Sequence, residues 1–214
     1  MKTLLTLLFL SLSLPLAGVA VGQINHVYNE VGIYAVPDPD GCASAQIDIA
    51  PLTGFQCYVV LTNPWNDDLD RPVSTIGFIN LYLPPPDGVW LLGATMPPLS
   101  TWDCWDCPLG YLWFPVDCTV TGQSVVLTTL TMLVEGPGPY LLFMSPPPPG
   151  FGSEFPGEMT YYETDGDHPV HVMDPVSGSF DVPVFAINWD GDLSFCETVP
   201  DEGTSFGSLK ALYR

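Results

Sequence analysis

Short apolar and β-branched runs recur along the chain and are separated by clusters of Pro, Gly and Asp. Runs of this length between turn-forming residues are typical of strands in an all-β fold. Between Gly32 and Ile187 no long stretch has an uninterrupted helical period, so any helix is expected near the C-terminus. The pattern predicts strands at Gly32–Val36, Gln46–Ile49, Gln56–Thr62, Ser74–Leu83, Val89–Thr95, Tyr111–Val116, Ser124–Val134, Tyr140–Met144, Glu158–Tyr162, Val170–Met173 and Val182–Ile187.

Two of these runs also indicate how the strands lie in a sheet. In Gln56–Thr62, strand alternation places Cys57, Val59 and Leu61 on one face and the intervening residues on the other. Ser124–Val134 carries apolar or Thr side chains on both faces, which predicts a central strand. The chain contains 24 Pro and 20 Gly, a density that long helices do not tolerate. We therefore predict an all-β protein, a single β-sandwich of immunoglobulin-like architecture with long Pro/Gly-rich loops.

The first residues have the layout of a secretory signal peptide. Lys2 precedes an apolar run over Thr3–Leu16, and small residues, among them Ala20 and Gly22, follow it. The run is shorter than the roughly 20 residues of a membrane-spanning helix, which favours cleavage over an uncleaved anchor. We expect a signal peptide at 1–22, a β-sandwich domain at 23–203 and a C-terminal tail at 204–214. The mature protein is then secreted, periplasmic or at the cell surface, without a membrane span.

The charge balance excludes two classes of partner. Four Lys and Arg residues stand against 24 Asp and Glu, a formal net charge of −20. Nucleic acids and anionic membranes are bound mainly through Lys and Arg, so neither is an expected partner. Solubility outside the cell is the simplest reason for such acidity, and a cationic ligand is the alternative. The expected partner is an unknown protein or polysaccharide at the cell surface.

The cysteines are even in number in a chain that carries an export signal. This combination predicts three disulfides, with the connectivity left open. A zinc site or a redox pair that begins at Cys104 and Cys107 is the alternative. The six residues are Cys42, Cys57, Cys104, Cys107, Cys118 and Cys196.

Several short turns carry oxygen donors of the kind that Ca²⁺ prefers. No run forms a complete calcium loop, and Asp, Asn and Gly are also the commonest turn formers, so ordinary turns are the competing interpretation. We expect no resident cofactor, with calcium as the open alternative. The candidate ligands are Asp165, Asp167, Asn188, Asp190 and Asp192.

No catalytic group is indicated by the sequence. His168 and His171 would point to opposite faces of a strand, and Pro169 prevents the helix that would bring them together. The prediction is a non-enzyme, a secreted binding or structural module. A secreted hydrolase is an alternative that would require two paired carboxylates in a cleft.

A cysteine-containing segment gathers aromatic residues that suggest a second alternative. Trp102, Trp105 and Trp113 lie within a short stretch beside Asp residues. Flat indole rings next to carboxylates hold sugar rings in carbohydrate-binding sandwiches, so these three residues are candidate ligand-binding residues. The competing interpretation is that the same rings bury a large apolar area at the end of the sandwich.

Four segments resemble the strand sequences of cohesin-type β-sandwich modules. They are Gln56–Pro64, Val73–Leu83, Val89–Gly93 and Val125–Val134, which follow the order of cohesin strands. The resemblance implies a cohesin-like fold, and cohesins bind dockerin partners through one sheet face. The chain departs from the family in its six cysteines and its proline-rich corners.

The two ends of the chain carry a further resemblance. Val31–Tyr34 and Ser208–Arg214 are similar to segments of exported bacterial proteins to which no activity is assigned. Phe206, Leu209 and Tyr213 recur at helical spacing beside Lys210, which predicts a short amphipathic helix in the tail. Packing on the sandwich and a sorting or docking role are both open for this tail.

Overall fold

The computed structural model describes residues 28–37, 45–96, 100–102, 110–149, 157–164, 167, 169–191 and 193. The regular secondary structure of this part of the chain consists of β-strands. They are β1 (Glu30–Tyr34), β2 (Gln46–Ile47), β3 (Thr53–Thr62), β4 (Trp65–Asn66), β5 (Arg71–Pro72), β6 (Thr75–Tyr82), β7 (Val89–Met96), β8 (Ser100–Trp102), β9 (Tyr111–Thr119), β10 (Ser124–Val134), β11 (Tyr140–Leu142), β12 (Met159–Glu163), β13 (Val170–Pro175) and β14 (Phe185–Ile187).

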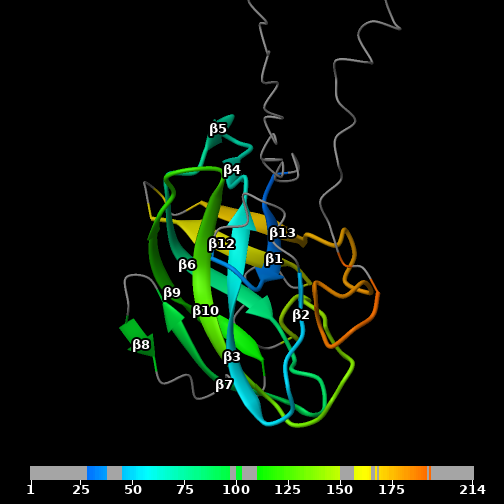
Figure 1. Ribbon diagram of the computed structural model, residues 1–214. Coiled ribbons are helices and arrows are strands. Elements are labelled where there is room, and N and C mark those ends of the chain that lie inside the picture. The colour runs from blue at the N-terminus through cyan, green and yellow to red at the C-terminus, as the bar shows by residue number, and fades with distance from the viewer. Residues whose placement is uncertain are drawn as a thin grey trace, which may run out of the picture.

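Most strands belong to one nine-stranded sheet that folds into two layers. Its order is β8-β7-β10-β3-β1-β13-β12-β6-β9. Figure 1 shows β3 and β10 in front of β6 and β12, so the first five strands form one layer and the last four the other. A three-stranded sheet, β11-β14-β2, and the β4–β5 hairpin complete the described fold. The prediction of an all-β sandwich is confirmed.

The core lies between the two layers and takes alternate residues from each strand. Cys57, Val59 and Leu61 of β3 are fully buried in it, as strand alternation predicts. From the opposite layer, Ile79 and Tyr161 are also fully buried. The three-stranded sheet adds further apolar side chains to the same core, namely Leu142, Phe185 and Ile187.

β10 is central, as predicted, since it pairs with β3 on one side and with β7 on the other. The burial of its side chains does not follow simple alternation along the whole strand. A β-bulge shifts the register with β3 between Val126 and Thr128. As a result Leu127 and Leu130, which strict alternation would place on opposite faces, are both buried in the core.

The layers join where β1 runs parallel to β13. Glu30 is opposite Asp174 and Val31 is opposite Pro175. The approach is close, because a Cβ added at Gly32 would lie 2.7 Å from a methyl group of Val176. Glycine at this position therefore permits the contact between the layers.

The eleven strands predicted from the sequence are all present, with differences of a few residues at their ends. The strands β4, β5 and β8 were not predicted. Each has only two or three residues, too few to show a period, and β5 contains Pro72, which ordinarily argues against a strand. The predicted signal peptide and C-terminal tail lie outside the described residues. Within the described part, no helix has the length and hydrophobicity that crossing a membrane requires.

The prediction that all six cysteines form disulfides is wrong for Cys57 and Cys118, which are free thiols. The Cys57 thiol lies in the core, 3.9 Å from the sulfur of Met132. The Cys118 thiol points to the carbonyl oxygen of Val126 at 3.5 Å. Cys57 lies on β3 and Cys118 on β9, which belong to opposite layers and contain no other described cysteine. The remaining four cysteines lie outside the described residues.

Both thiols should be unreactive in the folded protein and reactive after unfolding. Burial raises the pKa of Cys57 to about 12 and, together with nearby Asp117, the pKa of Cys118 to about 11. We expect a maleimide to label neither residue near neutral pH, but to label at least two thiols per chain in concentrated guanidinium chloride without reductant. The count is made by mass spectrometry, and a Cys57→Ala, Cys118→Ala double variant should lose two labels.

The same two thiols make the stability of the fold depend on pH, and the sign of this dependence follows from their raised pKa values. Because folding favours the protonated form, their contribution to stability is fully present below the ordinary thiol pKa of about 8.5. It is lost as the pH rises toward about 11. A wild-type chain that is no more sensitive to alkali than the double variant would contradict this assignment.

Candidate functional site

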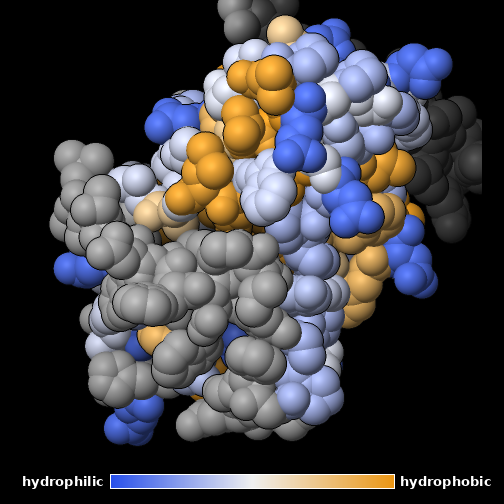
Figure 2. Space-filling view, turned by 90° about the horizontal axis from the view of Figure 1, so that it is seen from below, coloured by the Kyte–Doolittle hydropathy of each residue, from blue (hydrophilic) through white to orange (hydrophobic). Residues whose placement is uncertain are grey.

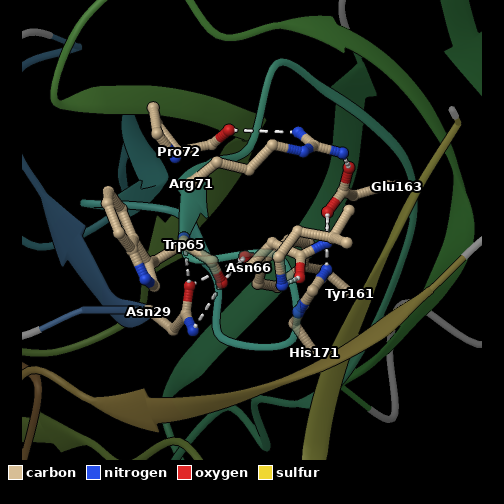
Figure 3. Close-up of polar contacts among 9 residues, drawn as sticks. Asn29, Trp65, Asn66, Arg71, Pro72, Tyr161, Glu163 and His171 are labelled. Atoms are coloured by element: carbon tan, nitrogen blue, oxygen red, sulfur yellow. Dashed lines mark hydrogen bonds and ion pairs between the residues drawn. The ribbon is translucent and has the colours of Figure 1, made fainter.

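A buried carboxylate anchors the β4–β5 hairpin to the layer beneath it. Glu163 lies at the end of β12, and its side chain is 0% exposed. Its Oε1 accepts hydrogen bonds from Nδ2 of Asn66 at 2.6 Å and from Nε2 of His171 at 2.9 Å. Its Oε2 accepts one from Nη2 of Arg71 at 2.8 Å. Figure 3 shows these groups converging on the carboxylate from three strands.

Next to this carboxylate, Asn29 and Tyr161 hold the backbone of Trp65. Oδ1 of Asn29 accepts hydrogen bonds from the Trp65 N–H and from the Tyr161 hydroxyl, both at 2.7 Å. Nδ2 of Asn29 donates to the Trp65 carbonyl at 3.1 Å. Burial and the nearby Glu163 raise the pKa of Tyr161 far above its ordinary value, so this hydroxyl remains a neutral donor.

The chemistry of this polar cluster is structural. Both oxygens of Glu163 already accept hydrogen bonds from side chains of the protein, so neither is positioned to take a proton from a substrate. The Tyr161 hydroxyl donates to Asn29 and is itself fully buried. We assign the cluster the role of fixing the hairpin, which is the kind of support that a rigid scaffold supplies.

The best candidate for a functional surface is the outer side of β7, β10 and β3. Strand pairing sets two rows of outward side chains across these strands. One row is Trp90, Leu133 and Gly54, and the next is Gly93, Thr131 and Gln56. Together with two exposed neighbours these residues are called the open face: Leu52, Gly54, Gln56, Trp90, Leu92, Gly93, Thr131 and Leu133.

The open face exposes large apolar side chains. Leu52 is 77% exposed, Leu92 60% and Trp90 54%. Leu92 points outward because it alternates with the buried Leu91, and the register shift between β7 and β10 places Gly93 on the same side as Leu92. Figure 2, which views the molecule from the lower end of Figure 1, shows hydrophobic side chains exposed as a group among hydrophilic ones.

Two glycines keep part of this face flat. A Cβ added at Gly93 would meet no atom within 4 Å, and one added at Gly54 would meet only a backbone oxygen at 3.6 Å. A side chain would therefore fit at either position without a clash, and its absence leaves open space above the sheet. No member of the open face is charged, in a chain whose formal net charge is −20.

The tryptophans chosen from the sequence are not tested by the structure. Trp102 ends β8 and Trp113 lies in β9, strands at opposite ends of the order of the nine-stranded sheet. The positions of these two side chains and the whole of Trp105 lie outside the described part of the chain. The carbohydrate site that they predict stays a prediction.

Of the calcium candidates, Asn188 has a structural role. Its Oδ1 accepts the Ile49 N–H at 2.6 Å, and its Nδ2 donates to the carbonyl oxygens of Ile49 at 2.8 Å and Pro137 at 3.0 Å. Asp167 and Asp190 are exposed turn or bend residues, and Asp165 and Asp192 lie outside the described residues. In the described ranges, no three His, Cys, Asp or Glu side chains gather as metal ligands would. Calcium binding stays a prediction.

Sequence reasoning missed both parts of the site. His171 lies on β13 and faces inward to Glu163, a role that the spacing from His168 did not suggest. Glu163 follows a predicted strand as an ordinary acidic residue, so nothing local distinguishes it. Trp90 and Leu92 do alternate with Val89 and Leu91, which could have marked a strand with two apolar faces.

Comparison with known proteins finds likeness among solved structures. No family model matches the chain, and no curated protein matches it. Among solved structures, it is similar to a type II cohesin domain from the cellulosome of Acetivibrio cellulolyticus, with 10% sequence identity and a TM-score of 0.45. The alignment covers 77% of this chain and 97% of that domain.

Removing the charge of Glu163 should destabilise the fold. Glu163→Gln keeps the shape but leaves the Arg71 guanidinium and the His171 ring without their carboxylate, which we expect to cost about 2–3 kcal/mol in urea unfolding. Asp68→Asn makes the same chemical change at an exposed position of the hairpin turn and should cost less than about 0.5 kcal/mol. Equal effects of the two substitutions would refute the anchoring role.

Asn188 should stabilise the fold both through the hydrogen bonds of its side chain and through its backbone conformation. Its φ of 53° lies in the left-handed region, which Asn tolerates better than Ala. We expect Asn188→Ala to lower the free energy of unfolding by about 2–3 kcal/mol, because three hydrogen bonds and a compatible conformation are lost. Asn188→Gly loses only the hydrogen bonds and should be more stable than the Ala variant by about 1 kcal/mol. Urea midpoints measure both, and the reverse order would exclude this account.

Proposed function

We propose that this chain is a secreted, non-catalytic module that binds another protein through the open face. The observation that carries the proposal is an exposed, uncharged face in a strongly acidic protein. Isolated apolar residues on a surface are ordinary, but a group that includes Trp90, Leu92 and Leu52 is typical of a binding surface. Tryptophan is also enriched among the residues that contribute most to protein–protein affinity.

The composition of the face favours a protein over a polysaccharide. Trp90 offers a flat ring on which a sugar could stack, and Gln56 and Thr131 offer hydrogen-bonding groups. However, the other large side chains are the aliphatic Leu52, Leu92 and Leu133, which are suited to apolar side chains of a partner. Secretion is supported by the signal-like sequence of residues 1–22.

Site-specific crosslinking tests this function. The full chain carries a photo-reactive amino acid in place of Leu92 and is incubated with concentrated extracellular protein of the organism that produces it. We expect a discrete protein adduct. An excess of unlabelled wild-type chain should suppress this adduct, and an excess of a Trp90→Ala, Leu92→Ser double variant should not. The matched control carries the same group at Val172, which is 40% exposed on the opposite layer.

Two results would overturn the proposal. One is equal crosslinking from positions 92 and 172, and the other is competition by the double variant as strong as by the wild-type chain. Retardation of the wild-type chain, but not of the double variant, in gels that contain polysaccharide would assign the face to a carbohydrate ligand instead.

A substitution at Gly93 gives an independent check. Gly93→Val adds a side chain where there is free space, so it should leave folding intact and raise stability by up to about 1 kcal/mol. The added group would stand in the middle of the open face and should weaken partner binding. A Val variant that is crosslinked from position 92 as efficiently as the parent chain would argue against binding at this face.

A further inference from the structure

Two carboxylates border the open face at its lower end. Glu135 follows Leu133 by two positions, so strand alternation places it on the same side as Leu133. Its N–H donates to the carbonyl oxygen of Gly88 at 2.8 Å, which sets it opposite the start of β7. Asp87 precedes Gly88 in the turn, and both acids are exposed. Two residues along a strand correspond to about 7 Å, so Glu135 lies close to the row of Trp90 and Leu133.

No positive charge of the described residues balances this acidic border. Arg71 is the one Lys or Arg in the described part of the chain, and its guanidinium bonds Glu163 under the β4–β5 hairpin. In Figure 1 that hairpin lies at the upper end of the molecule, while β7 begins at the lower end. The open face therefore combines apolar contact area with a negative border and with the overall negative field of the protein.

We infer that the open face, together with Asp87 and Glu135, binds a protein segment whose apolar side chains are followed by Lys or Arg. This inference rests on the proposed function and adds the chemistry of the partner. The apolar side chains of the segment pack on Trp90, Leu92 and Leu133, over the space left above Gly93. Its basic residues lie against Asp87 and Glu135, where an acidic segment would be repelled.

The probe is a phage-displayed library of random peptides, selected on the purified full chain and depleted on the Trp90→Ala, Leu92→Ser double variant. We expect the selected peptides to share a run of apolar residues next to Lys or Arg. Synthetic versions of these peptides should bind the wild-type chain more weakly as salt increases, because exposed charges are screened. Affinity and its salt dependence are measured by fluorescence anisotropy.

Charge reversal at the border gives the quantitative test. An Asp87→Lys, Glu135→Lys double variant should bind the selected peptides at least about tenfold more weakly and should lose most of the salt dependence. The matched control is Asp68→Lys in the hairpin at the other end of the molecule, which should change affinity by less than about twofold. Urea unfolding of each variant verifies that the fold is intact.

The outcomes separate this inference from the proposed function. The inference is overturned if the peptides need Trp90 for binding but lack basic residues, or if the charge reversal does not change their affinity. Either result is still consistent with protein binding at the open face. A selection that returns no Trp90-dependent peptide counts against both.

Residues 204–214 of this chain also combine apolar side chains with Lys210 and Arg214. If a selection on a chain without these residues returns such peptides and the selection on the full chain does not, the occupant of the open face is the tail and the inference fails. If the wild-type chain self-associates through Trp90, as sedimentation would show, the occupant is a second copy and the inference fails.

Discussion

The parallel contact between β1 and β13 is the constraint on which the rest of the structure depends. Only two residue pairs are in register there, yet they join the two layers into one sheet. The backbone N–H of Asp174 donates to the Asn29 carbonyl at 3.0 Å and that of Val176 to the Val31 carbonyl at 2.9 Å, which fixes the approach. Gly32 makes that approach sterically possible. The core forms because this joint turns the apolar faces of both layers toward each other.

The buried polar cluster secures the sandwich at the same joint. Asn29 immediately precedes β1, and it binds Trp65 of the hairpin and Tyr161 of the second layer. Glu163 continues the link to Arg71. A carboxylate without these partners would be costly in such a buried position, so the hairpin and the layers are expected to order together.

Local pattern was sufficient for the strands and insufficient for the site. The period of two in Gln56–Thr62 and the apolar character of Ser124–Val134 are properties of neighbouring residues, and both predictions were confirmed. The bulge that brings Leu127 into the core depends on the partner strand. The even number of cysteines suggested disulfides, although Cys57 alternates with Val59 and Leu61, the pattern of a core residue. For Cys57, the strand period therefore predicted the environment of the side chain better than the number of cysteines did.

The sequence by itself determined the class of fold, the positions of the main strands and the acidic character of the protein, because alternation, turn chemistry and charge are written in local residue order. Tertiary structure alone decided that Glu163 is buried among polar partners and which apolar face stays open. Glu163 is distinguished by its partners, since Asn66 and Arg71 reach it from 97 and 92 positions away and His171 reaches it from the next strand. Likewise, Trp90 and Leu91 are adjacent and both nonpolar, and only the second layer, packed against one side of β7, makes Leu91 core and leaves Trp90 exposed.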